Sequence, residues 1–131
     1  MRNYLILLFL FLSTNFCFAQ TQLEMNDQAR ENYQKIDTEL NSVYTKILKE
    51  YKSDTTFIKN LKIAQNIWLK FRDAEMKMKY PDREPGYYGS IQPVCWYNYL
   101  EKLTKKRTEE LKIWLTGIKE GDSCSGSVKM I

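Results

Sequence analysis

The most constraining feature of the sequence is a run of apolar residues spaced by three and four positions, with no glycine or proline between them. The run consists of Ala29, Tyr33, Ile36, Leu40, Val43, Ile47 and Tyr51. This spacing matches the turn of an α-helix, so all of these side chains lie on one helical face. A strand would instead place alternate residues on opposite faces. The pattern therefore predicts a long helix, beginning near Thr21 or Asn26, that buries this face against other helices.

Two further segments also have helical spacing. The first begins near residues 53–56 and ends at Tyr80, because Pro81 cannot continue a helix. Its expected buried stripe is Leu61, Ala64, Trp68 and Phe71. The other begins near Pro93, which suits a first helical turn, and ends at Gly117 or Gly121. Its apolar positions are Leu100, Leu103, Leu111, Trp114 and Ile118.

One substantial loop lies between the second and third helices. Residues 81–90 contain two prolines and two glycines, which exclude helix, together with two adjacent tyrosines. The other link between helices is short, so consecutive helices should run in opposite directions. The sequence predicts an all-α fold, a small antiparallel bundle of three main helices with one Pro/Gly/Tyr loop.

The N-terminal residues have the composition of a secretory signal peptide. Arg2 precedes an apolar run over residues 5–12, and small or polar residues follow up to Ala19. The run is too short to span a membrane, and no second long apolar run follows it. We therefore expect a signal peptide over residues 1–19, a helical domain over 20–118 and a flexible tail over 119–131.

Export implies a periplasmic or extracellular location without a membrane span in the processed chain. Cys17 raises the question of a lipid anchor, but Phe16 precedes it where bacterial lipidation signals require a small side chain. Cleavage after Ala19 is therefore expected instead of lipidation.

Composition excludes several classes of function. The chain has no histidine, which removes Ser-His-Asp and Cys-His catalysis and His-ligated zinc. Loss of Arg2 reduces the 20 basic residues to 19 against 16 acidic ones, so the processed chain carries a net charge of +3. No block of like charges occurs, so nucleic-acid binding is not expected.

No enzyme, metal site or cofactor is predicted. The sequence has neither metal-ligand spacing nor a glycine-rich phosphate loop. Asp73 and Glu75 are the nearest candidates for a pair of glycosidase carboxylates, but residues two apart on a helix point to different sides. An enzyme acting on wall sugars or peptides remains the weakest of the hypotheses.

Two cysteines, Cys95 and Cys124, follow the signal peptide. An even pair in an exported protein predicts one disulfide, which would tie down the tail. A nucleophilic thiol is the rival interpretation, with no histidine to activate it.

Two arginines occupy positions on apolar stripes. Arg72 follows Trp68 by four residues, and Arg107 lies four residues from both Leu103 and Leu111. A buried guanidinium requires acceptors, because an unpaired buried charge is very costly. The residues assigned to such a polar network are Asp37, Asn41, Arg72, Asp73 and Arg107. We favour an internal network that fixes the register of the helices over a ligand-binding or catalytic cluster.

The loop provides the candidate binding residues Tyr87, Tyr88, Gly89 and Ser90. Exposed tyrosines on a Gly/Pro loop build recognition surfaces, because rigid aromatic area loses little entropy on contact. The same tyrosines could instead cover one end of the bundle, and the sequence does not decide between these roles.

Several pieces of the sequence together resemble a known family. They are Asp37-x-x-Leu40-Asn41-x-x-Tyr44, Gln65-x-x-Trp68-Leu69-x-Phe71-Arg72-Asp73-Ala74-Glu75, Gly89-Ser90, and Cys95 followed by Leu103-Thr104-x-x-Arg107-x-x-x-Leu111. In order and spacing they are similar to the LprI-like N-terminal domain of exported bacterial proteins, named after a mycobacterial lysozyme inhibitor. The resemblance covers roughly residues 25–115.

The resemblance implies a helical envelope protein whose partner is lysozyme or another wall-active protein. The sequence departs from the family at Met76, where a cysteine is common that would pair with the one aligned to Cys95; Cys124 would have to replace it. Animal lysozymes are cationic, so a positive chain needs a local acidic or shape-matched patch to bind them. The alternative is a structural or accessory periplasmic protein, and the sequence specifies no oligomeric state.

Overall fold

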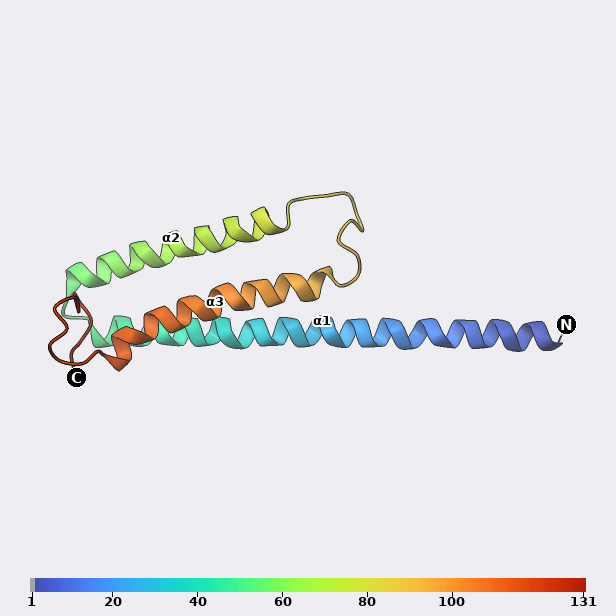
Figure 1. The fold of residues 1–131 in the computed structure, drawn as a ribbon, viewed down its shortest axis with the longest axis horizontal. Helices are drawn as coiled ribbons and strands as arrows, with labels where there is room; N and C mark the ends of the chain where they lie inside the picture. Colours follow the sequence, from blue (N-terminus) through green and yellow to red (C-terminus); the bar gives the residue numbers. More distant parts are fainter. Residues whose placement is uncertain (1) are drawn as a thin grey trace.

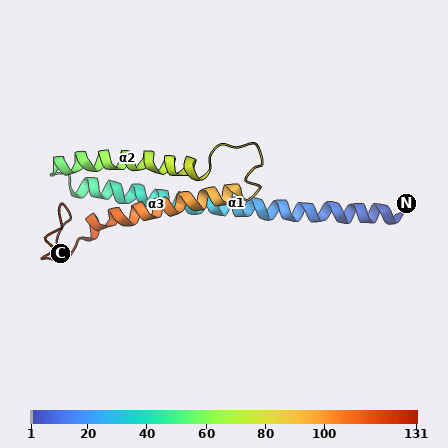
Figure 2. The same cartoon turned by 45° about the horizontal axis from the view of Figure 1, so that its top comes forward.

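The computed structural model describes the backbone of residues 2–131 and the side chains of residues 21–131. Its elements are α1 (Arg2–Glu50), α2 (Thr55–Lys79) and α3 (Gln92–Thr116). Helices α1 and α3 run in the same direction and α2 runs opposite to both (Figures 1 and 2). The predicted all-α antiparallel bundle of three helices is confirmed.

Helix α1 is longer than the sequence pattern indicated. It begins at Arg2 instead of near Thr21, since no glycine or proline interrupts residues 2–50. Its first part extends beyond the ends of α2 and α3 (Figure 1). The expected signal peptide, which includes Cys17, lies in the part of the chain whose side chains are outside the described residues. From Thr21 onward, no helix combines the length and apolar character that crossing a membrane requires.

The hydrophobic core lies where α1 meets α3 and the first half of α2. Its buried members are Leu40, Val43, Ile47, Leu61 and Leu111. The predicted stripe of α1 is confirmed, because every member is buried or half-buried. On α3, Thr104 and Thr108 are also fully buried. These small side chains suit the close packing of α3 along α1.

Helix α2 is rotated relative to the predicted stripe. Leu61 is buried and Trp68 half-buried as expected, but Ala64 is exposed and 52% of Phe71 remains accessible. The inward positions of α2 are Leu61, Gln65, Trp68, Arg72 and Met76. Gln65 and Arg72 face inward because both find polar partners on other helices. The outward face consequently carries the exposed apolar residues Ile63, Ile67, Phe71 and Met78.

Local sequence signals account for the ends of the helices. The side chain of Asp54 accepts a hydrogen bond of 2.9 Å from the backbone N–H of Phe57, which caps the start of α2. Pro81 follows one residue after the cap at Tyr80. Gly117 ends α3 with φ of 80°, a conformation that favours glycine.

Main-chain hydrogen bonds and one ion pair dock the C-terminal tail against the bundle. The N–H of Ile118 donates to the carbonyl of Lys129 at 3.0 Å, and the N–H of Ile131 donates to Ile118 at 2.8 Å. The N–H of Lys129 donates to the Tyr51 hydroxyl at 3.2 Å, and its ammonium pairs with Glu50 at 2.7 Å. These contacts take the place of the expected disulfide in holding the tail.

The expected bond between Cys95 and Cys124 is wrong for this structure, where both thiols are free. Cys95 lies in the first turn of α3, and Cys124 lies in the tail beyond its other end. At about 1.5 Å per residue, the helical stretch between them is roughly 30 Å long. Disulfide formation needs Cα atoms within about 7 Å, so the rigid helix keeps the two thiols apart.

Candidate functional site

Trp68 of α2 lies within cation–π distance of two guanidinium groups. The guanidinium carbon of Arg72 is 5.5 Å from the indole centroid, and that of Arg107 is 6.0 Å from it. The two arginine side chains are only 15% and 16% exposed. Cation–π contact stabilises a charge at such a site but supplies no hydrogen-bond acceptor. The acceptors must therefore come from other residues, and the two arginines differ in this respect.

Arg72 is surrounded by carboxylates. Its Nη2 and Nε atoms donate to Asp73 at 3.0 and 3.2 Å, and its Nη1 lies 3.7 Å from Asp37 of α1. Nη1 also reaches the hydroxyl of Tyr33 at 3.5 Å, and Asn41 donates to Asp37 at 3.3 Å. The structure thus brings four of the five expected network residues together, joining α1 to α2.

Tyr33 belongs to this network although the sequence did not single it out for that role. Its hydroxyl donates to Asp37 at 3.5 Å. Burial raises the pKa of Tyr33, the charge of Arg72 acts against that rise, and Asp37 adds to it. The network therefore contains two carboxylates, a carboxamide, a phenol and one guanidinium, an arrangement that suits a structural clamp between α1 and α2.

Arg107 is the network residue that stands apart. Its Nε donates to the side-chain oxygen of Gln65 at 3.1 Å, and its Nη1 is 3.8 Å from Glu110. Glu110 is the partner of Nη1, and Nη2 has no partner among the residues from Thr21 onward. Burial lowers the pKa of Arg107, and Glu110 partly offsets this effect. Gln65 was not predicted to belong to the polar network, although its position four residues after Leu61 indicates an inward-facing side chain.

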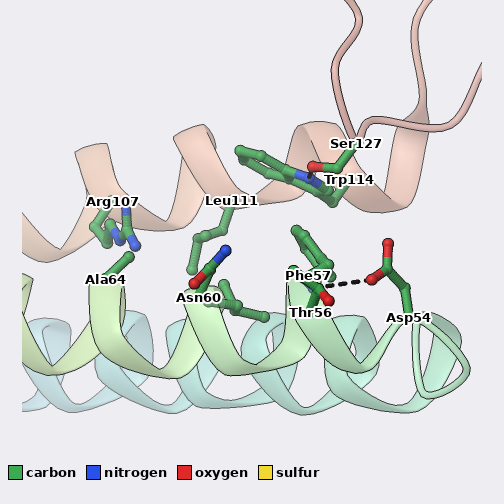
Figure 3. A pocket seen from close by; sticks show the side chains of 10 residues that line it. Asp54, Thr56, Phe57, Asn60, Ala64, Arg107, Leu111, Trp114 and Ser127 are labelled. Carbon is green, nitrogen blue, oxygen red and sulfur yellow. Dashed lines mark hydrogen bonds between the residues drawn. The ribbon is translucent and has the colours of Figure 1, made fainter.

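A groove of about 520 Å³ opens beside Arg107, between α2 and α3 (Figure 3). Arg107 lies at one end, opposite Ala64, while Trp114, Ser127 and Asp54 lie toward the other. The remaining lining residues are Thr56, Phe57, Asn60, Leu61 and Leu111. The tail contributes to the wall, because the indole N–H of Trp114 donates to the Ser127 hydroxyl at 3.0 Å. The groove is mainly apolar, with a cation at one end.

The two loop tyrosines occupy different environments. Tyr88 is half-buried, its hydroxyl donates to the carbonyl of Pro81 at 2.8 Å, and its ring packs edge-on against Tyr80. Tyr87 is 67% exposed, with the guanidinium of Arg83 at 5.7 Å from its ring. The neighbouring Gly89 and Ser90 are exposed as well. Tyr88 thus anchors the loop, and Tyr87 projects from it.

Tyr80 is the centre of an aromatic cluster below the loop. Its ring lies 5.6 Å from Trp96 and 6.5 Å from Tyr99. The hydroxyl of Tyr99 donates to Glu75 at 3.0 Å, and this bond raises the pKa of Tyr99; burial raises that of Tyr80. The sequence treated Tyr80 only as the end of α2, although an aromatic directly before Pro81 lies where the loop must pack. This aromatic cluster packs beneath the loop and supports it.

The described side chains contain no group of three or more Cys, Asp or Glu residues arranged to hold a metal ion. The arrangement offers two places for contact with a partner. One is the loop with Tyr87 at its surface, and the other is the groove beside Arg107. They lie toward opposite ends of the α2–α3 hairpin.

The chain is similar to known proteins in family, sequence and fold. A family model described as lysozyme inhibitor LprI matches residues 17–111. An uncharacterised protein of Rhizobium meliloti is 29% identical over 105 residues, which cover 72% of this chain and 73% of that protein. The crystal structure of a DUF1311 family protein from Pseudomonas putida KT2440 superposes with a TM-score of 0.58.

That superposition covers 68% of this chain and 88% of the Pseudomonas putida protein at 20% sequence identity, so it shows a shared fold. The family match spans most of α1, all of α2 and the greater part of α3, including Trp68, Arg72 and Arg107. The chain therefore belongs to the LprI family.

Proposed function

We propose that the protein is an exported, non-enzymatic binding protein of the bacterial envelope that inhibits a lysozyme or a related wall-active enzyme. Family membership supports this class of activity. The observation that carries the proposal is the exposed ring of Tyr87, held on a loop that Tyr88 anchors to the bundle. A rigid, exposed aromatic ring can bury a large area at low entropic cost.

The charge of the loop suits a cationic partner better than the net charge of the whole chain does. Asp82 and Glu84 are exposed on either side of Arg83, whose guanidinium stacks on Tyr87. Residues 81–90 thus carry two acidic side chains and one basic one, in a chain whose formal net charge is +4. Local complementarity of this kind guides association and orientation. We infer that Tyr87 and the two acids form the contact surface.

A structural or accessory role is the second candidate, and the network around Arg72 favours it. Two carboxylates and a tyrosine hydroxyl surround this guanidinium, which leaves it little capacity to bind a partner. In this alternative, all polar residues serve to hold α1 against α2. The loop would then be an end cover of the bundle, without a partner.

The test is a lysis assay with residues 20–131, which contain every residue of the hydrophobic core described above. Inhibition is measured for several lysozyme types at increasing molar ratio. We expect Tyr87→Ala to weaken inhibition about tenfold or more without changing the melting temperature, as for aromatic residues at interface centres. Phe71→Ala is the matched control: it removes an exposed aromatic ring on α2, outside the loop, so inhibition should persist.

Three outcomes are distinguished. Absence of inhibition by the wild-type protein at high molar excess on every lysozyme type would reject the inhibitor proposal in favour of the accessory role. Inhibition that survives Tyr87→Ala would reject the loop as the contact surface. If Tyr87→Ala reduces inhibition and also lowers the melting temperature, the loop serves to pack the bundle and is not the contact surface.

A further inference from the structure

The groove beside Arg107 has features that the proposed inhibitor function does not use. We propose that it binds a small amphiphile, a molecule with an apolar body and a single carboxylate head group. The head group would bind Arg107, and the body would lie along the groove toward Trp114. This site is separate from the loop, and the proposal does not depend on lysozyme inhibition.

The first support is the contrast between two similarly buried arginines. Arg72 is neutralised by Asp73 and Asp37, at 3.0 and 3.7 Å. Arg107 is as little exposed, yet its one hydrogen bond goes to the neutral amide of Gln65, and Glu110 lies 3.8 Å away on the surface. A guanidinium has five N–H donors, and Nη1 of Arg107 has only the ion pair with Glu110, while Nη2 has no partner among the described residues. An anionic acceptor would satisfy the N–H groups of Nη2.

The second support is the apolar lining next to that charge. Leu61 and Leu111 belong to the hydrophobic core and contribute to the groove, together with the ring of Phe57. In Figure 3 the guanidinium end of Arg107 points across toward Ala64 of α2, and Trp114 stands at the far end. A volume of about 520 Å³ lies within the range of sites for small organic ligands.

The charges around the groove also set the orientation of the ligand. Asp54 lies toward the far end and keeps its carboxylate there because it caps α2. That end therefore disfavours a second anionic group. Glu110 is half exposed and can turn into solvent when a carboxylate approaches Arg107. A ligand with one acidic end and an uncharged apolar end fits this arrangement, whereas a diacid does not.

The test uses two fluorescent probes that share an aromatic body. 8-Anilinonaphthalene-1-sulfonate carries an anionic head, and N-phenyl-1-naphthylamine has none. Both are titrated into residues 20–131. We expect the anionic probe to bind about tenfold more tightly, the difference that a charge-assisted hydrogen bond typically gives. Decanoate should displace this probe, and decan-1-ol should not, which tests the carboxylate directly.

Two tryptophan substitutions on α2 locate the site. Ala64→Trp places a bulky ring in the groove, and we expect it to weaken binding of the anionic probe about tenfold. Ala74→Trp is the matched control, because Ala74 is exposed on the same helix and does not line the groove. It should leave the affinity within about twofold, a difference of less than ~0.5 kcal/mol.

Arg107→Met tests the head-group contact, and its expected effect is loss of the preference for the anionic probe. The proposal is overturned if the two probes bind equally to the wild-type protein. It is also overturned if Ala64→Trp and Ala74→Trp have the same effect, or if decanol displaces the probe as well as decanoate does. If Arg107→Met fails to fold, the other comparisons still decide. Failure of lysozyme inhibition would leave these results unaffected, so the two proposals fail separately.

Discussion

Thr104 and Thr108 are both fully buried one turn apart on α3, but their hydroxyl groups differ. The hydroxyl of Thr108 donates to the carbonyl of Thr104 at 2.8 Å. The hydroxyl of Thr104 has no hydrogen-bond partner among the described residues. A buried hydroxyl without a partner keeps its desolvation cost and gains nothing in return.

We therefore expect Thr104→Val to increase the free energy of unfolding by about 1 kcal/mol, since valine has the same shape without the hydroxyl. Thr108→Val is the control and should not stabilise, because it removes a hydrogen bond that is made. Urea unfolding of both variants measures the difference. Equal midpoints for the two variants would contradict this explanation.

At this scale the sequence predicted which arginines are unusual but could not predict their partners. The positions of Arg72 and Arg107 on apolar stripes indicated partial burial, and both side chains are largely covered. Whether a carboxylate faces each one depends on how α1, α2 and α3 are rotated against one another. That rotation is a property of the packed molecule, so the sequence could not predict how few polar partners Arg107 has.

Helix α2 shows why the predicted stripe was partly wrong. Apolar side chains occur on two of its faces, one with Leu61 and Met76 and the other with Ile67 and Phe71. Hydrophobic spacing alone cannot choose between two such faces. Polar partners on the other helices decide the rotation. Gln65 reaches Arg107 of α3, and Arg72 reaches Asp37 of α1, only when these side chains face inward.

The two methionines near the end of α2 test this rotation. Met76 is 3% exposed and Met78 is 68% exposed, although they lie two residues apart on one helix. We expect Met76→Ala to lower the free energy of unfolding by about 2–4 kcal/mol. Met78→Ala should change it by less than about 0.5 kcal/mol. Thermal or urea unfolding compares the pair, and a larger effect at Met78 would show that the other face is buried.

For the whole molecule, helical spacing and the Pro/Gly loop were sufficient to predict the three-helix architecture. The position of the tail was not predictable, because composition suggested flexibility and the cysteine pair suggested a disulfide. The rigid length of α3 separates Cys95 from Cys124. The contacts that dock the tail instead involve the backbone of Lys129 and the hydroxyl of Tyr51, which leave no pattern in the sequence.

Gly117 tests whether the tail contributes to stability. A Cβ at this position would lie 2.8 Å from the side chain of Ile131 and 2.9 Å from the carbonyl of Lys129. Gly121 also has a positive φ, but a Cβ there would meet nothing within 4 Å. We expect Gly117→Ala to lower the free energy of unfolding by about 1–3 kcal/mol more than Gly121→Ala, because only the former displaces the tail. Equal losses in chemical unfolding would show that backbone strain alone is responsible.

The looser attachment of α2 has a consequence for local opening. Helices α1 and α3 approach each other closely along their length, whereas α2 makes fewer close backbone approaches to either. Cooperative units held by fewer buried contacts open at lower free energy than the rest of a protein. Helix α2 should thus detach as a unit while α1 and α3 remain paired, so its amides would exchange with solvent first. A molecule that touches both α2 and α3 would slow that exchange.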